Sequence, residues 1–324
     1  MKRRKTRAFR RLSGTPILFL GLQFAVAQPS VNQEQYLLNP VLLSPSLFIR
    51  TTTFSGWYTF RTDRAGFLGR PTLHLVDISG IPGKNFLLDG QLQYIYSNLY
   101  RSLYFTLGAG CQVRLGKDAF LTFSLNGMIS SKTLDLTDVM VDDPNDPLLV
   151  NQQRISQTHF NIGAGITLRI SRFAACFSSP MLFNNLTGTE AVSGITELGL
   201  QRNFLIYLDN EFRLNREGGF LKPSFLLRQI QQGPLVIDFC LQGGVTGKYW
   251  ASVLYRTTRI LGFSAGVGFW QRLLLSYSYE FCTGSSPGAS GGSHEITIGY
   301  RIQKKDSGPE LKDYFSVQKM NYTR

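Results

Sequence analysis

The residues best suited to acid–base or nucleophilic chemistry are three histidines, His74, His159 and His294. The last belongs to the triplet Ser293-His294-Glu295, which holds the residue types of a hydrolytic triad. Neighbouring residues of a strand point to opposite faces of a sheet, so these three side chains cannot form a triad by themselves. No two histidines have metal-ligand spacing either. We therefore expect no catalytic residue, no metal and no cofactor, with His294 and Glu295 anchoring a strand or its loop.

Oxygen ligands gather in one acidic stretch, which contains Asp138, Asp142, Asp143, Asn145 and Asp146. Such side chains are suitable ligands for calcium, but their spacing does not fit the EF-hand loop, with its alternating ligands, central Gly and closing Glu. We expect a solvated loop. The cysteines are few and scattered along the chain, and we expect free thiols at Cys111, Cys176, Cys240 and Cys282.

The elements that carry these residues show a period of two. From Leu103 to Leu115, apolar side chains alternate with polar or small ones, and the same alternation recurs from Phe160 to Ile170 and from Leu261 to Phe269. Period-two runs place one set of side chains on each face of a sheet. Their length matches the nine to eleven or so residues of a tilted membrane-crossing strand better than the roughly five or six of a soluble domain.

Further strands are expected at several less regular segments. The full set is 54–61, 71–78, 87–97, 103–115, 120–130, 160–170, 173–179, 198–208, 220–230, 235–241, 249–255, 261–269, 273–281 and 294–302. The pattern predicts an all-β protein, an antiparallel transmembrane β-barrel of about 14 strands, with 12 or 16 as neighbouring possibilities. The alternative is a periplasmic sandwich or jelly roll.

Glycines on the polar faces favour the barrel. A sandwich turns its polar face to water and has no reason to prefer residues without side chains, whereas glycines relieve crowding inside a barrel. The glycines in question are Gly108, Gly110, Gly163, Gly165, Gly266 and Gly268.

Several charged residues stand an even number of positions from the polar residues of their strands, so they share the parity, and therefore the face, of those residues. A charge inside a barrel must be paired or hydrated. We expect these charges to form a ladder that closes or plugs the lumen, and the alternative is a selectivity lining for a conduit. The candidates are Arg114, Arg169, Arg272, Glu280, Glu295 and Arg301.

The first 27 residues have the pattern of a cleaved export signal. A basic start is followed by an apolar run from Pro16 to Ala27, which ends in Ala25-Val26-Ala27 and predicts cleavage before Gln28. The run is too short for the roughly twenty residues of a membrane-spanning helix. Seven positive charges lie in this leader, which has no acid, so the formal charge falls from +13 to +6 in the mature chain. A nucleic-acid partner is therefore not expected.

The mature chain divides into three parts. Residues 28–302 form the expected barrel, with 28–50 as a periplasmic lead-in, and residues 303–324 form a polar C-terminal tail. Long connections are expected near residues 134–157, 181–197 and 284–292. In bacterial barrels the long loops face outward and the short turns face the periplasm.

Near its start the chain has the element Gln35-Tyr36-Leu37-Leu38-Asn39-Pro40, followed by Ser44-Pro45. This element resembles the opening of the PorP/SprF membrane proteins of the type IX secretion system of Bacteroidota, which commonly repeat Asn-Pro where Ser44-Pro45 stands. The resemblance is most specific at the C-terminal end, although Glu280 stands where the family commonly has Asp. The other matching residues include Pro223, Ser224, Trp250, Tyr255, Arg256, Ser293, His294 and Glu295.

The resemblance implies an outer-membrane barrel that works among lipids and helps to export or retain particular surface proteins. It implies as partners adhesin-like cargo with a conserved C-terminal sorting domain and periplasmic components of the secretion system. In some members it implies support of gliding motility. The alternatives are a passive diffusion pore and a barrel enzyme.

Overall fold

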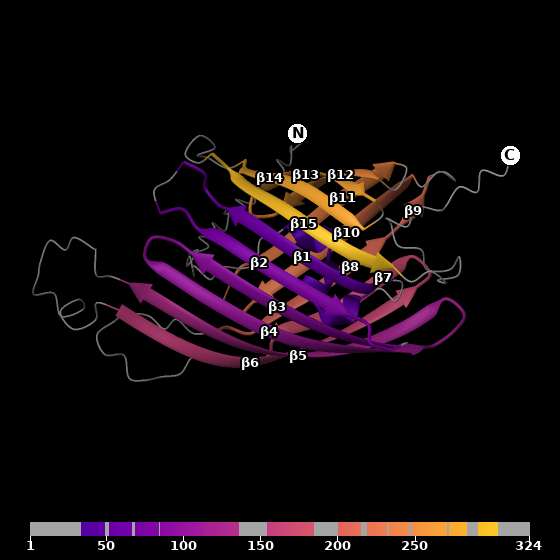
Figure 1. Cartoon of the computed structure of the whole chain (residues 1–324), viewed down its shortest axis with the longest axis horizontal. Coiled ribbons are helices and arrows are strands. Elements are labelled where there is room, and N and C mark those ends of the chain that lie inside the picture. The colour runs from indigo at the N-terminus through magenta and orange to yellow at the C-terminus, as the bar shows by residue number, and fades with distance from the viewer. Residues whose placement is uncertain are drawn as a thin grey trace, which may run out of the picture.

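The computed structural model describes residues 34–48, 52–66, 69–83, 85–135, 154–184, 200–214, 219–231, 233–245, 248–270, 272–283 and 291–303. One antiparallel sheet contains every described strand and closes on itself (Figure 1). Strand β1 (Thr52–Thr62) pairs with both β2 and β15, and the pairing of β10 with β11 closes the ring. The prediction of an antiparallel barrel is confirmed.

The remaining strands follow one another around the barrel. They are β2 (Thr72–Gly80), β3 (Phe86–Tyr96), β4 (Tyr100–Arg114), β5 (Ala119–Asp135), β6 (Arg154–Ile170), β7 (Phe173–Met181), β8 (Asn203–Asn210), β9 (Phe212–Arg213), β10 (Phe220–Ile230), β11 (Leu235–Val245), β12 (Tyr249–Arg256), β13 (Ile260–Phe269), β14 (Leu273–Cys282) and β15 (Ser293–Gln303). Because β8 and β9 both pair with β10 and are separated only by Glu211, they form one interrupted strand, and the barrel has 14 strands.

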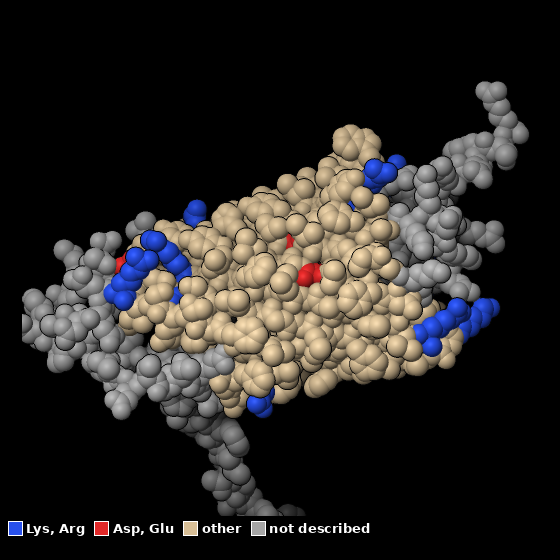
Figure 2. Space-filling model, turned by 60° about the horizontal axis from the view of Figure 1, so that its bottom comes forward, with Lys and Arg blue, Asp and Glu red and all other residues tan. Residues whose placement is uncertain are grey.

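Side-chain orientation follows the period of two. On β13, Phe263 is 45% exposed on the outer wall while its neighbour Ser264 is only 6% exposed inside. The alternation is the same on β6, where Ile166 faces out and Thr167 faces in. Lys and Arg side chains gather at the two ends of the view in Figure 2, and the broad wall between them is almost free of charge. This apolar band is the surface that lipid requires.

The longest hairpin connections lie at one end of the barrel. The longer connections 136–153, 182–202 and 283–292 all follow strands that run in the direction of β1, so they leave the same end. The connections 81–85, 115–118 and 171–172 lie at the opposite end, which we call the short-turn end. The acidic stretch 138–146 and the tail 304–324 lie outside the described residues. Among the described residues, no helix is long and apolar enough to cross a bilayer.

Candidate functional site in the barrel lumen

The chain before β1 fills the barrel. Residues Glu34–Phe48, which we call the plug, form three 3-10 turns, η1 (Glu34–Leu37), η2 (Pro40–Leu42) and η3 (Pro45–Leu47). Pro40 and Pro45 begin the second and third turns, where a fixed φ and a missing N–H are tolerated. The lead-in 28–50 was expected in the periplasm, and over the described residues that placement is wrong, because the plug packs inside the lumen.

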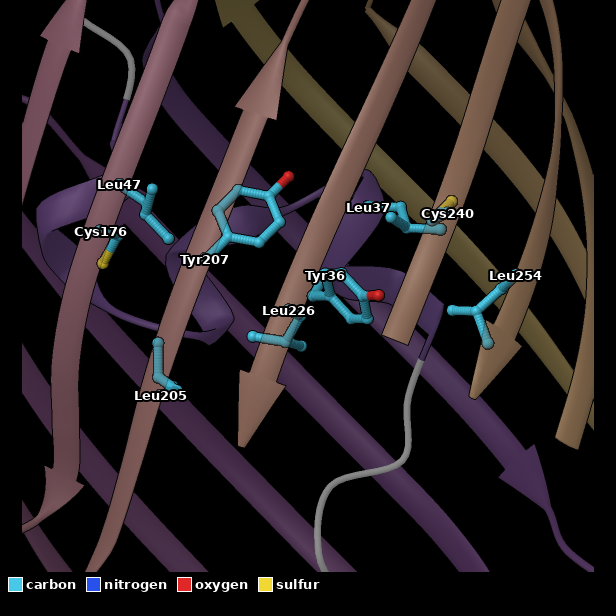
Figure 3. Packing of buried hydrophobic residues seen from close by; sticks show 9 residues of the cluster. All are labelled: Tyr36, Leu37, Leu47, Cys176, Leu205, Tyr207, Leu226, Cys240 and Leu254. Atoms are coloured by element: carbon cyan, nitrogen blue, oxygen red, sulfur yellow. The ribbon is translucent and has the colours of Figure 1, made fainter. Parts of the chain in front are cut away.

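The first anchor of the plug is an apolar cluster near the middle of the barrel (Figure 3). The ring of Tyr36 meets that of Tyr207 edge to face, with centroids 6.1 Å apart and planes at 86°. Leu37 and Leu47 lie in the same cluster. Strands β7 to β12 supply its other buried members, Cys176, Leu205, Leu226, Cys240 and Leu254. Burial of each large apolar side chain contributes about 1.5–3 kcal/mol, which favours a docked plug.

A second apolar anchor lies closer to the short-turn end. There Leu38 packs with Trp57 of β1 and Trp250 of β12, together with Phe220 and Leu274. The plug therefore contacts both an early strand and late strands of the chain. Its side chains occupy space that an open channel would leave to water.

Polar contacts fix the register of the plug. Asn39 donates from Nδ2 to Oδ1 of Asp77 over 2.7 Å, and the Oγ of Ser46 lies 2.7 Å from the hydroxyl of Thr167. Arg301 donates to the carbonyl oxygen of Leu38 at 3.3 Å. Hydrogen bonds require particular partner atoms, here on β2, β6 and β15. They therefore specify one position of the plug, which apolar packing alone would not.

Glycines of the strands leave room for the plug. A Cβ on Gly108 would lie 2.6 Å from Cγ of Pro45, and one on Gly165 would collide with the Oγ of Ser44. Of the six inward glycines named from the sequence, Gly110 also borders the plug, whereas Gly163 and Gly266 accommodate strand side chains and Gly268 has only ordinary contacts. Crowding inside the barrel was predicted from these glycines. At Gly108, Gly110 and Gly165 the crowding comes from the plug.

Beside the first turn of the plug lies a chain of buried ion pairs, which we call the ion-pair cluster. Its members are Arg61, Arg228, Asp238, Arg256, Glu280 and Glu295. Arg61 joins Glu280 at 2.6 Å and Glu295 at 3.4 Å, and Asp238 joins Arg256 at 2.8 Å and Arg228 at 2.9 Å. Arg256 and Glu280, 3.5 Å apart, connect the two halves. The three positive and three negative residues balance.

Glu34 of the plug enters this cluster at the position of Gly262. A Cβ on Gly262 would collide with Oε1 of Glu34, so the glycine makes the space that the carboxyl group occupies. Neither carboxyl oxygen of Glu34 has a hydrogen-bond partner among the described residues. Burial, followed by the negative charges of Glu280 and Glu295, raises the pKa of Glu34 to about 8, against the lowering effect of Arg61 and Arg256. At neutral pH the docked carboxyl group is therefore mostly protonated.

The structure divides the six charges expected in the lumen into two groups. Glu280, Glu295 and Arg301 are buried inside. Arg114 and Arg272 are exposed at the short-turn end, and Arg169 is half-buried near it. The sequence missed Arg61, Arg228 and Asp238, which lie on strands with weaker alternation. The sequence signal that could have identified them is their inward parity, which they share with Thr59, Leu226 and Cys240.

The family-motif residues lie partly in the plug and partly on the strands. Gln35, Tyr36 and Asn39 belong to the plug itself, and Thr59 donates to the Gln35 side chain. The strand members split by parity. Ser224, Trp250, Arg256 and Glu295 are buried inside, whereas Pro223 and Tyr255 are exposed outside, and Pro40, Ser293 and His294 are half-buried.

The histidines do not form a shared site. His294 faces outward, with Nδ1 2.7 Å from the hydroxyl of Tyr277, while Glu295 is buried inside. His74 makes a similar contact with Tyr58 at 2.9 Å on the outer wall. His159 is buried on β6. Within the described residues there is no group of three or more potential metal ligands.

The family model for the type IX secretion system membrane protein PorP/SprF matches residues 25–300. This chain belongs to the PorP/SprF family. The PorP/SprF match extends from before the plug to β15, so the plug is part of the family domain. The protein is accordingly a type IX secretion system component of the outer membrane, and association with other secretion components follows. No curated protein matches the sequence.

Solved structures similar to this PorP/SprF protein are outer-membrane barrels. The monoaromatic hydrocarbon channel CymD has a TM-score of 0.51 at 10% identity, covering 84% of this chain and 93% of its own. Omp33 of Acinetobacter baumannii has a TM-score of 0.48 at 5% identity, covering 79% of this chain and 100% of its own. At these identities the likeness to CymD shows the fold alone.

Proposed function

We propose that this protein helps to export or retain specific surface proteins, such as adhesins with a C-terminal sorting domain, and supports gliding motility in cells that glide. It acts as a plugged scaffold rather than as an open pore or an enzyme. The family membership supports the secretion role. The observation that carries the choice between scaffold and pore is the plug, which is held by apolar anchors and by directed hydrogen bonds.

A scaffold acts on particular cargo, whereas a diffusion pore acts on all small solutes that fit it. The test compares the surface and secreted proteomes of a wild-type strain, a deletion strain and a complemented deletion strain, with small-solute uptake measured in each. We expect one or a few surface proteins to fall in the deletion strain while uptake stays unchanged. Reduced uptake with an unchanged proteome would overturn the proposal and leave the diffusion pore.

A strain lacking only residues 304–324, the segment after β15, extends the same comparison. This segment is polar, and its loss removes little apolar area, so we expect the barrel to fold and to reach the membrane. A loss of the same cargo as in the full deletion would assign docking to the tail. Normal cargo would assign the cargo effect to the barrel.

A further inference from the structure

Four arginines surround the mouth of the barrel at the short-turn end. They lie on separate connections or strand ends: Arg114 ends β4, Arg169 is near the end of β6, Arg213 ends β9, and Arg272 precedes β14. Arg114, Arg213 and Arg272 are exposed and Arg169 is half-buried. We call these four residues the arginine mouth.

Their parity directs the four side chains toward the lumen rather than the lipid. Arg114 and Arg169 each follow an inward residue two positions earlier, Gln112 and Thr167, which are 4% and 1% exposed. Arg272 precedes the inward Leu274 by two positions. Arg213 pairs across the sheet with Phe220, which is buried inside, and directly paired residues share a face.

Within the described residues, the positive charge of this end has little compensation. No acidic side chain forms an ion pair with Arg114, Arg169 or Arg272, and Arg114 instead donates to the carbonyl oxygens of its own turn. Arg213 meets Glu211 at 3.4 Å. The described turns at this end add exposed Lys117, Arg172 and Lys248, against the exposed acid Asp118.

The segment after β15 does not complement this charge. The segment after β15 begins at the short-turn end, and residues 304–324 contain five basic and three acidic residues. Its net charge has the same sign as the mouth. Residues 304–324 therefore do not supply the negative charge that would complement the mouth.

We propose that the arginine mouth docks an acidic polypeptide segment of a protein on the periplasmic side. This inference rests on the proposed function for the presence of such a partner, and on the general rule that short turns face the periplasm. Guanidinium groups bind carboxylates in pairs of parallel hydrogen bonds, so acidic side chains suit them. Phospholipid headgroups surround the outer wall, whereas these four side chains have inward parity, which favours a polypeptide over lipid.

The test uses the full mature barrel in lipid nanodiscs and a fluorescent 15-residue poly-glutamate peptide as the probe. The test variant carries Arg114→Gln, Arg169→Gln, Arg213→Gln and Arg272→Gln. The matched control removes the same number of charges at the other end, with Arg64→Gln, Arg70→Gln, Arg101→Gln and Arg154→Gln. Folding of both is checked by their circular dichroism.

We expect the mouth variant to bind the peptide about tenfold more weakly at low salt, with the control within about twofold, and added salt to weaken wild-type binding. Equal losses in the two variants would overturn the proposal, since they would mean a general charge effect. Equal peptide binding by all three proteins would also overturn it. Competition by phosphatidylglycerol in the nanodisc that abolishes peptide binding would identify a lipid site instead.

The outcome is separable from that of the proposed function. If the mouth variant loses peptide binding while the full deletion leaves every surface protein unchanged, the mouth binds an acidic peptide but the secretion role fails. If the deletion lowers specific cargo while the mouth variant binds peptide as well as wild type, the secretion role stands and the docking proposal fails.

Discussion

Glu34 is the one charged residue of the plug, and its place among Glu280, Glu295, Arg61 and Arg256 makes it the most informative single residue. The strand residues of the ion-pair cluster already balance in charge, so an ionised Glu34 adds an unpaired negative charge to a buried site. Burial of such a charge is costly, and the carboxyl group is held neutral instead.

Docking of the plug should therefore depend on pH. The docked carboxyl group has a pKa of about 8 against an ordinary value of 4.5, so docking takes up a proton between these values. The contribution of the protonated Glu34 carboxyl group to the free energy of docking is fully present below about pH 4.5 and is lost as the pH rises through 8. Acrylamide quenching of Trp57 and Trp250, which pack on Leu38, measures it, and we expect stronger quenching at pH 9 than at pH 6.

Glu34→Gln is the matched variant for this measurement, because an amide keeps the shape and cannot ionise. Its quenching should be the same at both pH values. The exposed Trp270 contributes a constant background in both proteins. The same pH dependence in the variant would assign the effect to other groups of the ion-pair cluster and contradict the role of Glu34.

Individual positions in the lumen were only partly predictable. Alternation states which face of the sheet a residue takes, and Glu280, Glu295 and Arg301 are buried inside. It does not state depth along the strand, so Arg114 and Arg272 shared the inward parity and yet lie at the rim. The partner of Glu280 and Glu295 is Arg61, and no local pattern connects residues more than 200 positions apart in sequence.

Among the elements, the strands were predictable and the plug was not. All 14 expected strands are present, because a lipid-facing strand must alternate along its whole length. The largest boundary error is at β6, expected from Phe160 and observed from Arg154, and β8 was expected from Leu198 and is observed from Asn203. The plug consists of short 3-10 turns, which have no apolar period to detect, and it is held mainly by contacts to distant strands.

The outer face of the strands can be tested by depth. Ile298 lies at the centre of β15 and is 46% exposed, whereas Leu115 lies just beyond β4 and is 58% exposed. Ile298→Arg should destabilise the barrel by about 2–4 kcal/mol and Leu115→Arg by about 0–1 kcal/mol, because the cost of a lipid-facing charge depends on depth. Denaturant unfolding in lipid vesicles measures both. Equal costs would mean that this wall does not face lipid.

The plug can be locked by one substitution. The Oγ of Ser46 lies 3.7 Å from the Sγ of Cys176, which is a free thiol on β7. We expect Ser46→Cys to form a disulfide with Cys176 on mild oxidation, and intact-mass and peptide mapping detect it. The double variant Ser46→Cys, Cys176→Ala is the control. Failure to cross-link in the folded barrel would place the plug elsewhere.

For the whole molecule, the sequence predicted a membrane barrel but not that its lumen is filled. The structure adds the asymmetry of its ends, since the three longer connections leave one end and the arginine mouth lies at the other. The predicted signal peptide, the acidic stretch and the tail lie outside the described residues and stay predictions. Because the plug fills the lumen, we expect it to close the barrel to ions.

Ion conductance across a planar bilayer tests whether the plug closes the barrel. The set comprises the wild type, oxidised Ser46→Cys and a variant lacking residues 28–48, with the double variant Tyr36→Ala, Leu38→Ala as a second weakened plug in case the deletion does not fold. We predict no steady conductance for the wild type and the oxidised variant, and steady channels once the plug is removed or weakened. Steady conductance of the oxidised Ser46→Cys barrel equal to that of the plug-deficient variants would mean that the plug does not close the barrel.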